Sequence, residues 1–116
     1  MYNEIIQELS SLDQDSIIKI VLSKSKREIQ KATTRPLLLK NNRKWQVEKI
    51  INNQAFHSNI EYHDLKNHVL SLLNEYEFSE INIILKEKTI SFRMTKKGKL
   101  FRHEHDAVLK NNVILS

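Results

Sequence analysis

Residues 62–96, YHDLKNHVLSLLNEYEFSEINIILKEKTISFRMTK, decide the fold because they change from a helical to an alternating pattern of apolar residues. The first part, 62–76, predicts the main helix, since its apolar residues form one stripe at helical spacing. Residues 80–86 and 89–96 alternate apolar and polar side chains, which predicts two strands that each bury one face. Lys97–Gly98 follows as a hairpin turn, in which the single glycine supplies a positive φ. The helix stripe, which we expect to cover the apolar face of both strands, consists of Leu65, Val69, Leu72 and Leu73, and the strand residues are Ile81, Ile83, Leu85, Ile90, Phe92 and Met94.

Before this stretch, short β-rich segments separated by polar turns predict an antiparallel meander. A helix capped by Asp15 is the alternative for the first segment. Pro36 places its strand at an edge, or itself near a strand start, because proline donates no ladder hydrogen bond. The expected strands are 17–23, 34–40, 44–51 and 54–60, with a connecting loop at 24–32, turns at 41–43 and 52–53, a short helix at 2–11, and a last strand that begins at 99–103.

The predicted fold class is therefore α+β, in one domain that spans residues 1–116. It consists of an antiparallel sheet of about six to seven strands in meanders, one main helix packed on the sheet and a short N-terminal helix. Residues 104–116 are not assigned to an element.

Positive charge is concentrated in residues 16–49, which hold ten Lys or Arg and two Glu, whereas the whole chain has a net charge of +5. Residues 91–116 are also basic, and residues 1–15 and 50–90 carry more acids than bases. Such a balance favours acidic partners, above all nucleic acid. The plainer interpretation, solvated lysine-rich loops, stays open.

Several enzyme classes are excluded by residues that the chain lacks. It has no cysteine, and its single glycine rules out nucleotide-binding loops of the G-x-G-x-x-G and P-loop types and the G-x-S-x-G nucleophile motif. We therefore expect no catalysis by this chain alone and no cofactor. His103-Glu104-His105-Asp106 places two histidines on one face of a strand, where they can chelate a metal, but no third firm ligand follows, so we expect no bound metal.

The N-terminal sequence MYNEIIQELS shows neither a signal peptide nor a membrane span, and the absence of cysteine fits a reducing compartment. We expect a cytoplasmic protein that does not bind a membrane.

Nucleic-acid binding has the best physical support, because Lys and Arg neutralise phosphates and aromatic rings stack on bases. Trp45 or Tyr62 can supply such a ring, although a single Trp in a small sheet also fits a core position. We expect the loop after residue 23, the turn at 43–44 and the hairpin at 96–99 to converge on one side. The candidate residues are Lys24, Lys26, Arg27, Lys31, Arg35, Arg43, Lys44, Trp45, Arg93, Lys96, Lys97 and Lys99.

Several short segments, in this order, resemble the N-terminal region of bacterial class I S-adenosylmethionine-dependent methyltransferases thought to act on RNA. They are Ser23 with the basic residues after it, 35–40 (RPLLLK), 45–48 (WQVE), 56–60 (FHSNI), 94–99 (MTKKGK) and 105–115, and the similarity covers roughly residues 17–115. The resemblance implies an accessory domain that presents RNA to a methyltransferase domain. Because the glycine-rich cofactor loop of that family is missing here, the chain should neither bind S-adenosylmethionine nor transfer a methyl group.

The function expected from the sequence is thus a non-catalytic RNA-binding domain, either detached from a downstream methyltransferase domain or free-standing. Two alternatives remain open at this point. One is a protein-interaction domain whose basic face meets an acidic protein. The other is a small metal-dependent nuclease built on His103, Glu104, His105 and Asp106.

Overall fold

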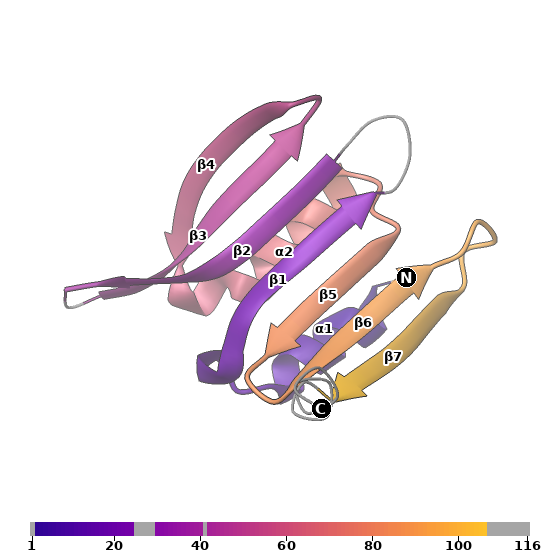
Figure 1. Ribbon diagram of the computed structural model, residues 1–116, viewed down its shortest axis with the longest axis horizontal. Helices are drawn as coiled ribbons and strands as arrows, with labels where there is room; N and C mark the ends of the chain where they lie inside the picture. The colour runs from indigo at the N-terminus through magenta and orange to yellow at the C-terminus, as the bar shows by residue number, and fades with distance from the viewer. Residues whose placement is uncertain (1, 25–29, 41, 107–116) are drawn as a thin grey trace, which may run out of the picture.

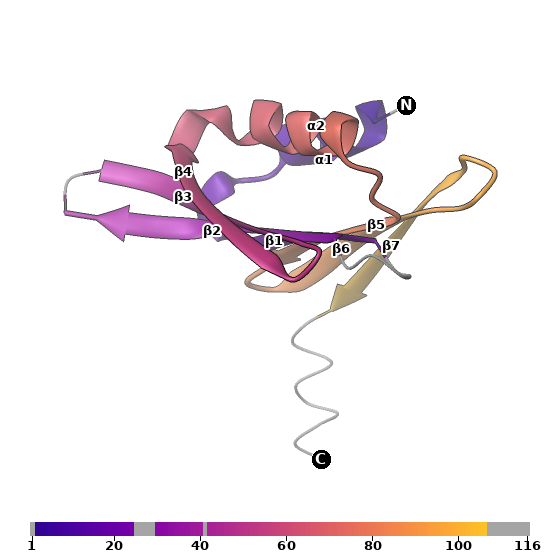
Figure 2. The ribbon, with the colours of Figure 1, turned by 90° about the horizontal axis from the view of Figure 1, so that it is seen from above.

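The computed structural model describes residues 2–24, 30–40 and 42–106, which form an antiparallel sheet with helices on one side (Figures 1 and 2). The sheet has seven strands in the order β4-β3-β2-β1-β5-β6-β7. Its elements are α1 (Asn3–Ser11), a 3-10 turn (Gln14–Ser16), β1 (Ile17–Lys24), β2 (Gln30–Leu39), β3 (Asn42–Ile51), β4 (Gln54–Glu61), a second 3-10 turn (Tyr62–Asp64), α2 (Leu65–Glu75), β5 (Glu80–Leu85), β6 (Lys88–Met94) and β7 (Leu100–Asp106).

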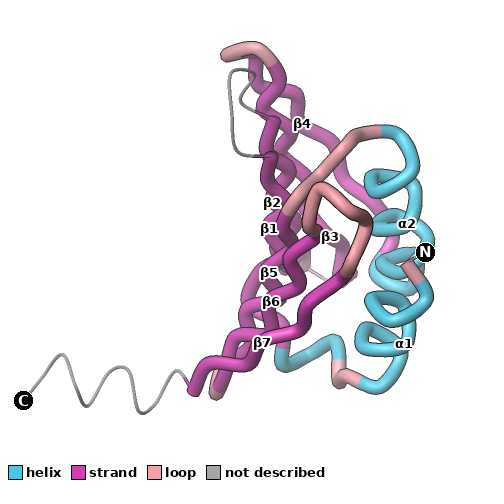
Figure 3. Tube along the Cα trace, turned by 90° about the vertical axis from the view of Figure 1, so that its right-hand side faces the viewer, coloured by secondary structure: helices cyan, strands magenta, loops and turns pink. Residues whose placement is uncertain are grey.

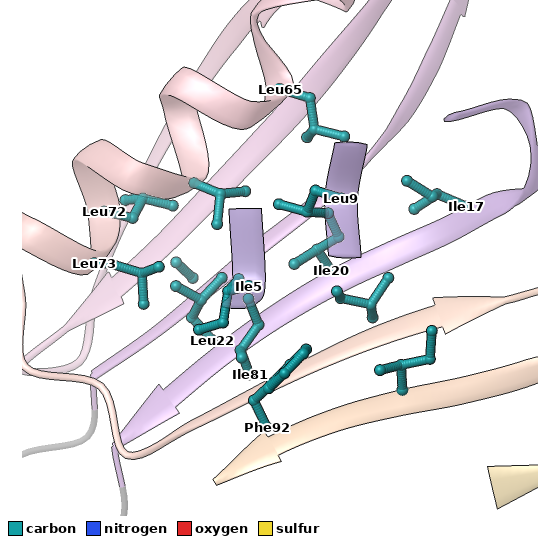
Figure 4. Close-up of a cluster of buried hydrophobic side chains, with 14 of the residues drawn as sticks. Ile5, Leu9, Ile17, Ile20, Leu22, Leu65, Leu72, Leu73, Ile81 and Phe92 are labelled. Carbon is teal, nitrogen blue, oxygen red and sulfur yellow. The ribbon is translucent and has the colours of Figure 1, made fainter. Parts of the chain in front are cut away.

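This architecture confirms the predicted α+β class, the main helix and the short N-terminal helix. Residues 17–24 form a strand, so the helical alternative for this segment is wrong. Alternate residues of β5 and β6 face the helices, as predicted. Figure 1 places α1 behind β5 and β6 and α2 behind β1 and β2, so the expectation that the α2 stripe alone covers β5 and β6 is wrong. Figure 4 shows Leu72 and Leu73 of α2 above Leu22, Ile81 and Phe92 of the sheet.

The predicted loop at 24–32 is too long, because β1 extends to Lys24 and β2 begins at Gln30. The inward-facing residues of early β2 are Ala32 and Thr34, which give little apolar signal in the sequence. Residues 25–29 and 41 lie outside the described residues, so the turn expected at 41–43 is described from Asn42 onward.

Pro36 lies within β2, which has β1 on one side and β3 on the other. It pairs with Trp45 of β3, but the pairing of β2 with β1 ends at Thr34. Pro36 therefore lies neither in an edge strand nor near a strand start, so that expectation is wrong. The proline is tolerated because β2 has no β1 partner at this residue.

Two turns adopt the backbone conformation that their residues favour. Asn52 and Asn53 both have positive φ, 51° and 67°, in the two-residue turn between β3 and β4. Gly98 has φ 82° in the β6–β7 hairpin.

Both helices pack against the same face of the sheet, as Figures 2 and 3 show. Ile5 and Leu9 of α1 join Leu65 and Val69 of α2 in the core. No described helix or loop covers the opposite face, onto which Figure 1 looks. Neither described helix has the length and apolar character that crossing a bilayer requires.

Candidate nucleic-acid interface

The sheet face opposite the helices is the candidate interface, and the strand registers fix which residues lie on it. In β1, Ile20 and Leu22 are buried toward the helices, so Lys19 and Val21 point to the other side. Cross-strand pairing extends this face in rows: Val21 pairs with Asn82, Asn82 with Ser91 and Ser91 with His103. A second row runs Glu80–Arg93–Phe101 and a third Ile84–Thr89–His105.

A register shift in β1 between Ile17 and Lys19 supports this arrangement. Ile17 pairs with Leu85 and is buried, whereas Lys19 pairs with Ile84 on the uncovered face. Ile18 is the extra residue between them and is exposed. Ile17 and Lys19 would share a face in a regular strand, and the β-bulge places them on opposite faces while the strand remains paired.

Residues of β1, β5, β6 and β7 line an open hollow of about 930 Å³ on this face. Its lining combines two cations, Lys19 and Arg93, with the rings of β7 and a polar floor. The floor is a hydrogen-bonded chain: the Ser91 hydroxyl donates to Asn82 Oδ1 at 2.5 Å, and Asn82 Nδ2 donates to Glu80 Oε1 at 3.0 Å.

Four cations on the uncovered face have no carboxylate partner within ion-pair distance among residues 2–24, 30–40 and 42–106: Lys19, Lys31, Arg35 and Arg93. Lys44 lies on the same face, but its Nζ is 3.3 Å from Glu61 Oε1. The two other acids there are also engaged, Glu48 with His57 at 3.0 Å and Glu80 with Asn82. The described part of this face thus carries five Lys or Arg and three Glu, so its formal net charge is positive.

Three rings lie in one column along β7 on the uncovered face: Phe101, His103 and His105. Phe101 is 56% exposed. The two imidazole rings contact each other edge to face, with centroids 4.2 Å apart. The column belongs to an edge strand, so β7 has a strand neighbour on one side only within the described sheet.

Trp45 cannot stack on a base, which corrects its assignment as a nucleic-acid contact. Its side chain is fully buried on the helix side of the sheet. The Trp45 ring stacks on the ring of Tyr62 with centroids 5.0 Å apart, and Nε1 donates to the Tyr62 carbonyl at 2.9 Å. Helix placement, which strand alternation does not reveal, decides that this face is the inner one.

Arg43 belongs to the same helix-side cluster and not to the uncovered face. It forms an ion pair with Asp15, and its guanidinium lies 5.8 Å from the centre of the Tyr62 ring. The Tyr62 hydroxyl also donates to Asp15 at 2.6 Å. Desolvation by burial, followed by the bond to Asp15, raises the pKa of Tyr62 to about 12, and the hydrogen bond from Tyr62 holds the pKa of Asp15 below its usual value. Arg43 therefore stabilises the junction between the first 3-10 turn and the end of β4.

The turn at 43–44 and the hairpin at 96–99 do not converge as the sequence suggested. Arg43 lies at the end of the sheet opposite the β6–β7 hairpin, because β3 begins where β1 and β6 do (Figure 1). The hairpin that carries Lys96, Lys97 and Lys99 bends toward the helix side (Figures 2 and 3). Lys24 forms an ion pair with Glu77 at 3.3 Å, and Lys26 and Arg27 lie outside the described residues.

The His103–Asp106 segment does not assemble one metal site. His103 and His105 lie on the uncovered face, whereas Glu104 faces the helix side and contacts Lys88 at 2.9 Å and Arg102 at 2.8 Å. In the described part of the chain, no group of three or more His, Asp or Glu is arranged to hold a metal ion. The nuclease alternative thus lacks a convergent set of ligands.

Of the expected contacts, Lys31, Arg35, Lys44 and Arg93 lie on the uncovered face. Sequence reasoning missed Lys19 and Phe101 as site residues and interpreted the two histidines only as metal ligands. The signal was present in the alternation Phe101, His103, His105, which places three rings on one side of a strand.

No protein-family model matches the chain, and neither the curated proteins nor the solved structures gave a significant match.

Proposed function

We propose that this chain is a non-catalytic RNA-binding domain whose binding surface is the uncovered face of the sheet. The observation that carries the proposal is the combination, on one face, of four unpaired cations with exposed rings on β7. Phosphate neutralisation by such cations drives nucleic-acid association, and rings beside them can stack on bases. The resemblance of short sequence segments to the N-terminal region of RNA methyltransferases supports RNA as the ligand. In this proposal the chain presents the RNA to a methyltransferase domain.

The arrangement of charge favours a nucleic acid over a metal-dependent reaction. Glu48 contacts His57 and Glu61 contacts Lys44, while Glu80, the cross-strand partner of Arg93, accepts a hydrogen bond from Asn82. Lys and Arg outnumber these three carboxylates on the described part of the face. Arg93 and Lys19 border the open hollow of about 930 Å³. A polyanion can therefore approach Lys19, Lys31, Arg35 and Arg93 together.

The test measures affinity for a single-stranded RNA as a function of salt concentration. Affinity should fall with salt, and Lys19→Ala and Arg93→Ala should each flatten the slope of log affinity against log salt by about 0.7. Lys66→Ala is the matched control, because Lys66 is an exposed cation on α2, on the opposite side of the molecule. It should leave both affinity and slope unchanged.

Two results would count against the proposal. One is a wild-type chain that does not bind RNA at low salt. The other is an equal loss of affinity in the Lys66 and Arg93 variants, which would mean unspecific attraction by net charge. Specific capture of an acidic protein through the same cations, with no RNA binding, would favour the protein-interaction alternative.

A further inference from the structure

We infer that the ligand of the uncovered face is single-stranded and that its bases stack along β7, one on Phe101 and the next on the contacting pair His103 and His105. This inference rests on the proposed function and adds the form of the ligand and the orientation in which it binds.

The spacing of the rings on β7 supports stacking of successive bases. Alternate residues of a strand are about 6.8 Å apart on the same face, a distance that an extended single strand can bridge between neighbouring bases. The imidazole rings of His103 and His105 are in edge-to-face contact, so they offer one position beside that of Phe101. β7 thus presents two adjacent stacking positions.

On the uncovered face, the cations lie closer to the middle of the sheet than these rings do. Their positions determine where the phosphates pass. Arg93 of β6 is directly paired with Phe101, and Lys19 of β1 lies across the hollow in the row of His105. The phosphate backbone would therefore run over the hollow, between these two cations, with the bases directed outward onto β7. Phe101, more than half exposed, leaves room for this arrangement.

A duplex cannot use this platform because its base faces are already stacked on one another. It can offer only its phosphates to Arg93 and Lys19. In the floor of the hollow, the Ser91 hydroxyl and one Asn82 amide proton are used within the chain Ser91–Asn82–Glu80, which leaves fewer donors for reading bases. We therefore expect binding that tolerates many sequences, as stacking on aromatic rings does.

The experiment compares Phe101→Leu with wild type, using a short oligouridine and an RNA duplex as probes. Phe101→Leu keeps an apolar side chain but removes the ring, so affinity for the oligouridine should fall about 5- to 150-fold. The salt slope should stay at the wild-type value, because no phosphate contact is lost. Phe101→Trp keeps an aromatic ring and should bind the oligouridine about as tightly as wild type does. The duplex should bind more weakly than the oligouridine, with the same affinity for wild type and both variants.

Phe56→Leu is the matched control, because Phe56 is 49% exposed on the other edge strand, β4, on the helix side. It should bind the oligouridine as wild type does. If Phe101→Leu fails to fold, the double variant His103→Ala/His105→Ala tests the second stacking position with the same expected loss.

Two outcomes would overturn the inference without touching the proposed function: unchanged affinity of folded Phe101→Leu while Arg93→Ala weakens binding, or equal binding of duplex and oligouridine. Absence of salt-dependent RNA binding by the wild-type chain would instead remove the proposed function, and this inference with it.

Discussion

A hydrogen bond between Thr34 of β2 and His68 of α2 connects the sheet to the helix, with Thr34 Oγ1 3.2 Å from His68 Nε2. Thr34 is fully buried. Burial lowers the pKa of His68 below its ordinary value, and Lys49, which faces it from β3, acts in the same direction. The unfolded chain takes up a proton at His68 near pH 6.5, whereas the folded chain resists it. Protonation therefore favours the unfolded state as the pH falls through this value.

We accordingly predict that the free energy of unfolding decreases between about pH 7.5 and about pH 5.5, where the unfolded state binds more protons. Denaturant titrations across this range should show a smaller decrease for His68→Gln, which cannot be protonated. His63→Gln is the control, since His63 is exposed on the turn before α2. An unchanged pH dependence in His68→Gln would show that this histidine does not couple protonation to folding.

The sheet face on which a single side chain lies was the least predictable feature, and Trp45 shows why. The alternation in β3 correctly predicts that Trp45 and Val47 share a face. Which face is buried depends on where α1 and α2 pack, and that contact is long-range. Arg43 follows the same rule, because its partner Asp15 precedes it by 28 residues and lies in a different element.

At the level of elements, α2 contributes its apolar stripe to the core, and Leu72 is one of the four residues of this stripe. Leu72 is 3% exposed and packs toward the sheet (Figure 4). We predict that Leu72→Ala lowers the free energy of unfolding by about 2–5 kcal/mol, through lost burial and the cavity left behind. Chemical denaturation monitored by circular dichroism would measure the change.

Leu70 offers a control on the same helix, since it is 37% exposed on the other side. Leu70→Ala should cost clearly less than Leu72→Ala because less surface is removed from contact. Equal costs for the two variants would contradict the packing of α2 on the sheet.

The sequence predicted α2, β5 and β6 well because their apolar residues are large and regularly spaced. It predicted the start of β2 and the length of β7 poorly. In β2 the inward residues are small or polar, and in β7 Arg102 and Glu104 occupy inward positions. Arg102 forms ion pairs with Glu104 and with Glu8 of α1. Arg102 and Glu8 are 94 residues apart, so their contact leaves no local pattern in the sequence.

For the whole molecule, the position of a cation relative to the two sheet faces matters more than its position in the sequence. Residues 16–49 carry most of the basic charge, yet folding distributes it between the two faces. Arg35 lies on the uncovered face without an acidic partner in the described chain, and Arg43 lies on the helix side in contact with Asp15 and Tyr62. The two arginines are eight residues apart and provide a matched pair of substitutions.

Their different surroundings predict opposite effects of the same change. Arg35→Ala should weaken RNA binding and flatten the salt slope by about 0.7, because one phosphate contact is lost. Its stability should change by no more than about 0.5 kcal/mol, as is usual for an exposed charge outside any network. Arg43→Ala should leave RNA affinity and slope unchanged but lower the melting temperature, since Asp15 and the Tyr62 ring lose their cation. Parallel salt titrations and thermal melts of the two variants would measure both effects. If Arg43→Ala lost as much RNA affinity as Arg35→Ala, the uncovered face could not be the sole binding surface.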